Sequence, residues 1–117
     1  MTDSILIYHN PRCSKSRSTL ALLTDKGIQP EVVEYLKTPP DKQQLEQLLN
    51  MLGLEPRQLM RTHESEYKEN NLADDSLSRN QLIDAMIKYP KLIERPIVIC
   101  NGKAAIGRPP ETILEIL

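Results

Sequence analysis

Residues 4–27 read SILIYHNPRCSKSRSTLALLTDKG, and this stretch sets the type of fold. Residues 4–8 form a short apolar run that an Asn-Pro pair closes, which predicts a buried β-strand. Leucines then recur at helical spacing up to Gly27, a residue that can adopt the left-handed conformation found at helix ends. A strand therefore leads into a helix, with Cys13 at the turn between them.

Two further strand signals complete a sheet. Residues 32–36 carry β-branched side chains and predict a second strand, which is parallel to the first because a helix connects the two. Residues 97–100 and 103–106 flank an Asn-Gly pair, which supplies the two positive φ angles of a tight hairpin turn. A last helix is predicted after the hairpin, because a Pro-Pro-Glu start is followed by apolar residues on one side.

The middle of the chain predicts a helical insertion. Its clearest helix starts after residues 39–41 and carries leucines at i, i+3, i+4 and i+7. A shorter helical piece opens at Pro56, and another helix follows the capping pair Ser78 and Gln81. Residues 63–75 are acidic and are predicted to form a solvated loop with one helical turn. This order predicts an α/β fold: a thioredoxin-like mixed sheet of about four strands with a central helical insertion.

Composition excludes several classes of protein. The 117 residues are 26% charged and 39% hydrophobic, which suits one globular domain over residues 1–117. Fifteen basic residues balance sixteen acidic ones, so no nucleic-acid partner is expected. No apolar run approaches the roughly 18 residues of a membrane span. The first residues carry Asp3 and no basic cluster, so no secretory signal is expected. We expect a cytoplasmic monomer.

The two cysteines are read as free thiols. They lie far apart in the sequence and fit no zinc-binding spacing, so we expect no metal. Cys100 ends a predicted strand, where it is either a structural residue or a resolving thiol. The second role requires its Cα to lie within about 7 Å of that of Cys13.

Cys13 has the surroundings of a reactive thiol. At the first turn of a helix it lies beside free backbone N–H groups and the positive end of the helix dipole. Both favour the thiolate, which is the nucleophilic form. The same loop could hold a tetrahedral oxyanion against the sulfur. An isolated cysteine is more often an inert small residue, but the neighbouring basic and hydroxyl side chains favour reactivity: Arg12, Ser14, Lys15, Ser16 and Arg17.

Other candidate residues leave alternatives open. His9 either favours the thiolate of Cys13 or is a hydrogen-bonded loop histidine, whereas His63, in the acidic stretch, is expected to be solvated. Pro96 starts a strand, where proline can adopt the cis form and, in a thioredoxin-like sheet, face the cysteine loop. A proline that merely ends an irregular stretch is the alternative. Three arginines are further candidates: Arg61, Arg95 and Arg108. Each is by itself more often a surface residue and becomes a ligand only if its side chain converges on Cys13.

Several separated motifs resemble the glutaredoxin-coupled arsenate reductase family. The residues that carry the resemblance occur in the same order along nearly the whole chain: 5–17, 34–40, 59–61, 82–86, 93–98 and 107–111. The resemblance implies a thioredoxin-like fold and the reduction of arsenate to arsenite. It also implies no bound cofactor, with glutathione as co-substrate and glutaredoxin as the partner that reduces the resulting mixed disulfide.

The resemblance also assigns roles to individual residues. Cys13 would attack arsenic to form a covalent thiol–arsenate adduct, and His9 and Ser16 would favour its thiolate. Three arginines would bind the oxyanion: Arg61, Arg95 and Arg108. Their forked donors suit the paired oxygens of such an anion. Because Cys13 has no CxxC partner, turnover needs an external thiol in any case.

Two alternatives remain from the residues and the resemblance. The same thiol could act on another substrate, such as a glutathione mixed disulfide on a protein. The chain could also be a non-catalytic, Spx-like regulator that binds RNA polymerase. Those regulators generally carry CxxC at the first motif, and Ser16 stands here in place of the second cysteine, which argues against that reading.

Overall fold

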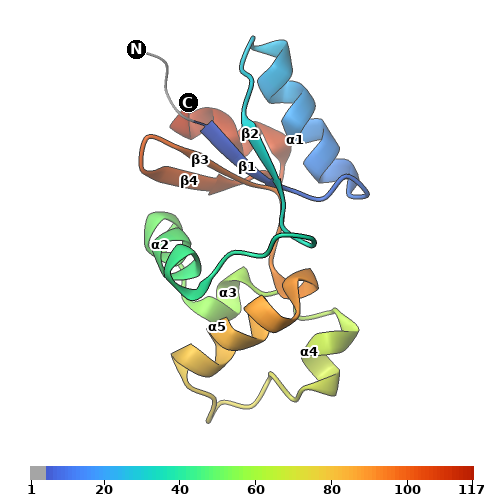
Figure 1. The fold of residues 1–117 in the computed structure, drawn as a ribbon, viewed down its shortest axis with the longest axis vertical. Helices are drawn as coiled ribbons and strands as arrows, with labels where there is room; N and C mark the ends of the chain where they lie inside the picture. The colour runs from blue at the N-terminus through green and yellow to red at the C-terminus, as the bar shows by residue number, and fades with distance from the viewer. Residues whose placement is uncertain (1–4) are drawn as a thin grey trace. The chain divides into compact units, whose positions relative to one another are not determined.

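The computed structural model describes residues 5–117 and confirms the mixed α/β fold (Figure 1). Four strands form one sheet in the order β2-β1-β3-β4. The β1–β2 pair is parallel, and β1–β3 and β3–β4 are antiparallel. The strands are β1 (Ile5–His9), β2 (Glu31–Glu34), β3 (Ile97–Cys100) and β4 (Lys103–Ile106). This is the thioredoxin-like sheet that the sequence predicts; Ser4, with which the first predicted strand begins, lies outside the described residues.

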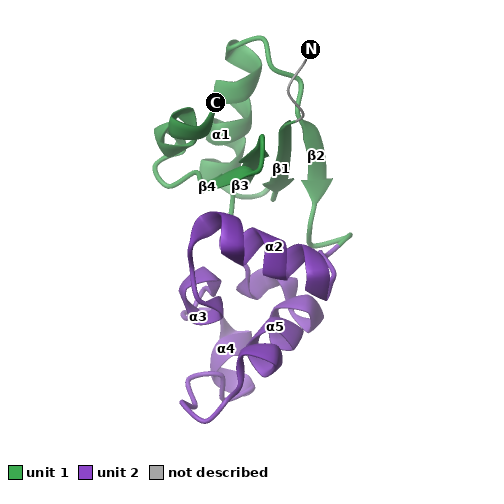
Figure 2. Ribbon diagram, turned by 90° about the vertical axis from the view of Figure 1, so that its left-hand side faces the viewer, with its two compact units in different colours: residues 1–38, 95–117 green, residues 39–94 purple. Residues whose placement is uncertain are grey.

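The chain groups into two compact units (Figure 2). Unit 1 runs to Thr38 and resumes at Arg95, and it holds the whole sheet. Unit 2, Pro39–Glu94, is the predicted helical insertion. That residues 1–117 form a single domain stays a prediction.

Unit 1 is built around one apolar cluster. Helix α1 (Ser14–Asp25) and the 3-10 helix η2 (Pro110–Ile116) contribute side chains to the same cluster as β1, β3 and β4, so both helices cover the same face of the sheet. The buried members of the cluster are Ile7, Leu23, Val98, Ala105 and Ile113. Full burial of a side chain of leucine size contributes about 1.5–3 kcal/mol, so burial of this cluster stabilises unit 1.

The hairpin forms as its turn residues predict. Asn101 has a φ of 52° and Gly102 a φ of 75°, which are the two positive angles expected of a tight turn. The register pairs Ile97 with Ile106. The hairpin therefore returns the chain to the end of β3 from which it started, and this places the residues after β4 beside those before β3.

The structure refines two sequence predictions, one on where a strand ends and one on the type of a helix. The second strand ends at Glu34 rather than residue 36, because the N–H groups of Lys37 and Thr38 both donate to the Glu34 carbonyl and turn the chain. The last predicted helix is a 3-10 helix rather than an α-helix.

Unit 2 consists of short helices with well-defined ends. They are α2 (Lys42–Leu52), α3 (Pro56–Leu59), α4 (Ser65–Glu69), α5 (Arg79–Lys88) and the 3-10 turn η1 (Pro90–Leu92). The predicted capping box of Ser78 and Gln81 is present, and Asp41 and Gln44 form another. Helix α4 lies in the acidic stretch for which one helical turn was expected.

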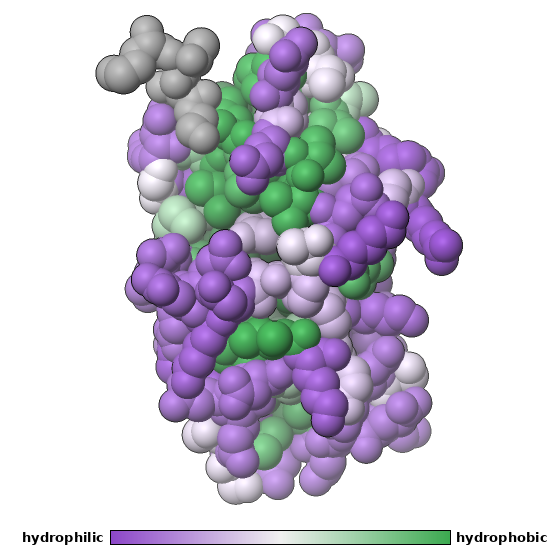
Figure 3. Space-filling view, in the orientation of Figure 1, coloured by the Kyte–Doolittle hydropathy of each residue, from purple (hydrophilic) through white to green (hydrophobic). Residues whose placement is uncertain are grey.

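Some apolar side chains remain at the surface. Figure 3 shows apolar residues gathered over the part of unit 1 where β1 and β2 lie. The large exposed hydrophobics of the described chain are Val32, Leu36, Leu114 and Leu117. No helix within residues 5–117 is long and apolar enough to span a bilayer.

Candidate active site

Cys13 occupies the N-cap of α1, at the strand-to-helix turn predicted from the sequence. Its N–H donates to the Asn10 carbonyl at 3.0 Å, and its own carbonyl accepts from the Arg17 N–H at 3.0 Å. An N-cap side chain commonly accepts a bond from the first turn of its helix. Cys13 makes no such capping bond among the described residues. Its sulfur remains available at the positive end of the helix, although the residue is only 9% exposed.

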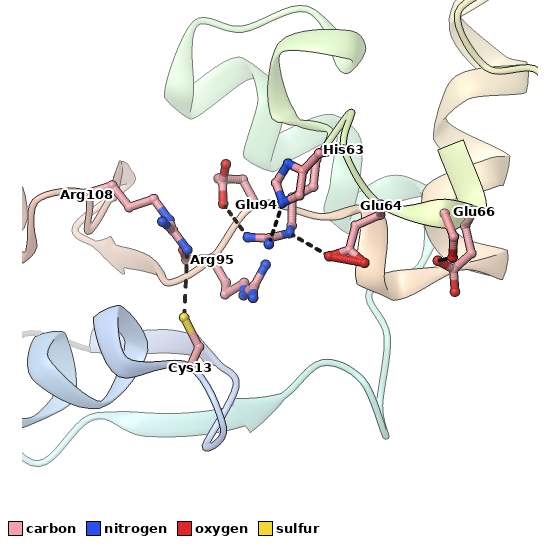
Figure 4. Close-up of polar contacts among 9 residues, drawn as sticks. Cys13, His63, Glu64, Glu66, Glu94, Arg95 and Arg108 are labelled. Carbon is pink, nitrogen blue, oxygen red and sulfur yellow. Dashed lines mark hydrogen bonds and ion pairs between the residues drawn. The ribbon is translucent and has the colours of Figure 1, made fainter. Parts of the chain in front are cut away.

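Arg108 approaches this sulfur from the other end of the chain. Its Nη2 lies 3.7 Å from Cys13 Sγ, as Figure 4 shows, and its Nε donates to the Arg95 carbonyl at 2.8 Å. The second bond holds the guanidinium in place while a terminal nitrogen reaches the thiol. The structure thus places Arg108, one of the three predicted arginines, against Cys13. It also bonds Arg108 to the backbone carbonyl of Arg95, another of the three.

The segment before β3 is fixed against the segment after β4. The Gly107 N–H donates to the Pro96 carbonyl at 2.9 Å. The Arg95–Pro96 peptide bond is cis, the form considered from the sequence, and Arg108–Pro109 is cis as well. Arg95 is half-buried. Both arginines are therefore carried by backbone whose position follows from the hairpin.

Gly107 is a position whose importance the sequence alone did not reveal. A Cβ there would lie 2.8 Å from Pro96 Cγ and would collide with Thr19 Oγ1. Thr19 is fully buried on α1, where its hydroxyl donates to the Lys15 carbonyl. Only glycine lets this backbone approach the first turns of α1, and Arg108 is the next residue.

We expect Gly107→Ala to lower the free energy of unfolding by about 1–3 kcal/mol, the usual cost of overpacking. Urea denaturation of the purified variant measures this. In a Thr19→Ala background, Gly107→Ala should lower the free energy of unfolding by less than it does in the wild-type background. The reason is that Thr19→Ala removes one of the two side chains with which the new Cβ collides. Equal unfolding midpoints for Gly107→Ala and wild type would show that the contact yields without cost.

His9 and Ser16 form a buried pair at the base of the loop. Ser16 Oγ lies 2.6 Å from His9 Nδ1 and accepts from the Asn10 N–H at 3.0 Å. Burial lowers the pKa of His9, Glu34 opposes this and Arg17 adds to it. A neutral ring then accepts a hydrogen bond from the Ser16 hydroxyl at Nδ1 and carries its own proton on Nε2, an assignment that follows from the bonding pattern. His9 is thus a hydrogen-bonded loop histidine; its effect on the Cys13 thiol stays a prediction.

The lowered pKa of His9 gives stability a pH dependence. The unfolded chain binds the His9 proton more readily than the folded one, so stability is fully present above about 6.5 and falls as pH drops towards the lowered folded value. We expect a lower urea midpoint at pH 5.0 than at pH 7.5, with a slope of at most about 1.4 kcal/mol per pH unit from this group. His9→Gln should flatten the slope, and His63→Gln, at an exposed position, should retain it.

Arg61 belongs to unit 2 and has partners there. Its Nε lies 3.3 Å from Glu64 Oε1, its Nη1 lies 3.2 Å from Glu94 Oε1, and its Nη2 lies 2.9 Å from His63 Nε2. His63 is exposed, as expected, but its contact with Arg61 was not predicted. All three partners lie in unit 2, so the binding of an oxyanion by Arg61 stays a prediction.

Cys100 is placed as a structural residue. It is 1% exposed, and the sheet register pairs it with Ile5 at the start of β1. Cys13 follows the opposite end of that strand, and four residues of strand span about 13 Å at roughly 3.3 Å each. This is well beyond the Cα separation of about 7 Å that a disulfide tolerates. Neither Cys13 nor Cys100 takes part in a disulfide within the described residues.

No group of three or more His, Cys, Asp or Glu side chains within residues 5–117 is arranged to hold a metal ion. The chemistry that these residues themselves offer is that of a single thiol at a helix N-terminus, with a guanidinium against its sulfur.

Comparison with known proteins identifies the family. The family model described as "ArsC family" matches residues 8–116, which includes Cys13 and all three predicted arginines. The chain belongs to the ArsC family.

Individual ArsC relatives match over almost their full length. A protein of Escherichia coli strain K12 named "Uncharacterized protein YfgD" is 61% identical over 100% of this chain and 99% of its own. An "Arsenate reductase" of Neisseria meningitidis serogroup A is 51% identical over 97% of each chain. A solved structure titled "Arsenate reductase from Vibrio cholerae" is 57% identical, covers 100% of both chains and superposes with a TM-score of 0.97.

Proposed function

We propose that this protein is an arsenate reductase that uses Cys13 as its nucleophile and glutathione with glutaredoxin as its reductants. The observation that carries the proposal is the contact between Cys13 Sγ and Arg108 Nη2 at the N-terminus of α1. The relatives named as arsenate reductases, at about half identity or more over the whole chain, support the choice of substrate.

The loop offers two things that an arsenate anion requires. The N–H groups at the start of α1 and the positive end of its dipole attract an oxyanion. Arg108 adds a forked, permanently charged donor beside the sulfur, and Arg95 and Arg61 are proposed as the further ligands. A charge-assisted hydrogen bond of this kind contributes about 1.5–3 kcal/mol.

The first chemical step is a substitution at arsenic. The thiolate of Cys13 attacks, a sulfur–arsenic bond forms, an arsenic–oxygen bond breaks, and the oxygen leaves as water once protonated. Arg108 stabilises the thiolate before the attack and balances the negative charge of the adduct after it. His9 and Ser16 hold the shape of the loop through their 2.6 Å contact.

The second step reduces arsenic by two electrons. A glutathione thiolate attacks the sulfur of Cys13, a disulfide bond forms, and the electron pair of the broken sulfur–arsenic bond stays on arsenic. Overall, arsenic acid and two thiols give arsenous acid, one disulfide and one water. The placement of Cys100 at the far end of β1 supports the need for an outside thiol. Glutaredoxin then reduces the mixed disulfide on Cys13, in the cytoplasm, where thiols are kept reduced.

A coupled assay tests the proposal. Purified protein is mixed with arsenate, glutathione, glutaredoxin, glutathione reductase and NADPH, and arsenate-dependent loss of NADPH absorbance is followed. We expect turnover that requires each component and yields arsenite in equal amount to NADPH consumed. Turnover of a glutathionylated protein without turnover of arsenate would show that the substrate is a protein mixed disulfide and not arsenate. No turnover of either substrate, together with capture of RNA polymerase, would favour a regulatory role.

A further inference from the structure

A cavity lies beside the Cys13 loop, wholly within unit 1. Its volume is about 220 Å³. One wall is the loop itself, residues 9–12, and the other is the end of β2 with the turn after it. The lining residues are His9, Asn10, Pro11, Arg12, Glu34, Leu36 and Lys37.

The loop wall of this cavity is held in one shape. The Asn10 carbonyl accepts from Cys13, the Asn10 side chain accepts from the Arg12 N–H at 3.0 Å, and the Asn10 N–H donates to Ser16. Three bonds on one residue therefore set the position of Arg12, which directly precedes Cys13. Cys13 itself does not line the cavity but directly follows its wall in the sequence.

The charged groups around the cavity are of both signs. Arg12 and Lys37 are cationic and exposed, and Glu34 is anionic and lies 3.6 Å from Lys37. This ion pair is open to water, with 80% of the Lys37 side chain and 43% of that of Glu34 exposed, so it contributes little by itself and can exchange partners with a ligand. Leu36 adds an apolar surface that is 39% exposed.

A tetrahedral oxyanion does not match this pattern. It carries no cation to pair with Glu34 and no apolar part to cover Leu36. Two cations and one carboxylate complement a ligand that has two carboxylates and one ammonium group. The volume is below the range of about 300–1,000 Å³ typical of drug-sized ligands, which suits one arm of a short peptide.

We propose that this cavity binds the small-thiol reductant of Cys13, a tripeptide thiol of the glutathione type, with Arg12 and Lys37 holding its carboxylates and Glu34 its ammonium group. The inference rests on the proposed function, because it gives the second thiol of that reaction a binding site. An extended tripeptide spans about 10 Å at roughly 3.3–3.6 Å per residue. Because Cys13 directly follows Arg12, we expect a ligand of this length, anchored in the cavity, to bring its thiol to Cys13.

The test uses S-methylglutathione, which has the charges of glutathione but no free thiol. We expect it to slow the alkylation of Cys13 by iodoacetamide, followed by intact-protein mass spectrometry, and to shift the backbone amide NMR signals of Arg12 and Lys37. Its apparent Kd should rise fivefold or more in Arg12→Ala and in Lys37→Ala. Lys103→Ala is the matched control, because it loses the same charge from an exposed lysine paired with Cys100 at the far end of the hairpin.

Two results would overturn the inference. One is the absence of protection and of amide shifts at millimolar S-methylglutathione. The other is an equal change of Kd in Lys103→Ala, which would show attraction by overall charge alone. Arsenate reduction with dithiothreitol, a neutral dithiol, is measured in parallel. Arsenate reduction by dithiothreitol without binding of S-methylglutathione would reject the cavity proposal and keep the proposed arsenate reductase activity. Binding of S-methylglutathione without any arsenate reduction would reject the proposed activity and keep the cavity as a binding site.

Discussion

Replacing Cys13 with serine should lower arsenate-dependent turnover at least about 1,000-fold, because a hydroxyl is far less acidic than a thiol and supplies almost no ionised nucleophile at neutral pH. The contacts that fix the loop use the backbone of Cys13 and not its sulfur, so the fold should persist. The coupled NADPH assay measures turnover, and circular dichroism and a urea midpoint confirm that the variant is folded.

Cys100→Ala provides the matched control for this prediction. It removes a sulfur from a fully buried position paired with Ile5, at the end of β1 that lies away from the loop. We expect a loss of stability of about 1 kcal/mol from the missing packing, with kcat within twofold of wild type. Turnover of Cys13→Ser equal to that of wild type would reject Cys13 as the nucleophile. Loss of turnover only in Cys100→Ala would assign the nucleophile to Cys100 instead.

Arg108→Ala should lower kcat/KM for arsenate about 10- to 150-fold, which corresponds to the loss of one charge-assisted contact of about 1.5–3 kcal/mol. The guanidinium lies 3.7 Å from the sulfur, so the variant should also slow the alkylation of Cys13 by iodoacetamide at neutral pH. Arg108→Lys keeps the charge but loses the fork that also bonds the Arg95 carbonyl, so its kcat/KM should lie between the two.

Arg79→Ala is the comparison for the loss of an arginine elsewhere. Arg79 is an exposed residue of unit 2 whose partners are Glu46 and Glu55. We expect kcat/KM and the alkylation rate of this variant to match wild type. A reduced alkylation rate in Arg79→Ala equal to that in Arg108→Ala would show an effect of net charge and remove the special role of the contact with Cys13.

Much of the fold follows from local sequence signals. The Asn101-Gly102 turn and the Ser78–Gln81 capping box each depend on residues within a few positions of one another, and both formed as predicted. Element ends were harder: β2 stops at Glu34 because two backbone N–H groups further along compete for its carbonyl. The 3-10 form of η2 has no signature in the spacing of its apolar residues.

The candidate site divides in the same way. The position of Cys13 could be predicted because the residue follows a strand and starts a helix, both of which are local features. Which arginine contacts Cys13 could not be predicted from the residues alone, because a single arginine looks the same in a sequence whether it is solvated or faces a thiol; only the family resemblance named Arg108. Arg61 is an example: its contact with Glu64, three residues away, is local, but its contact with Glu94 joins segments that are far apart in the sequence.

The sequence by itself determined that a lone thiol stands at the start of a helix, since hydrophobic periodicity and the closing Asn-Pro pair act over a few residues. Only the tertiary structure decided that Arg108 touches this thiol, across a separation of 95 residues. That contact requires the β1–β3–β4 register and the close approach of Gly107 to Thr19. Its cause is the packing of one buried cluster, which no short stretch of the chain contains.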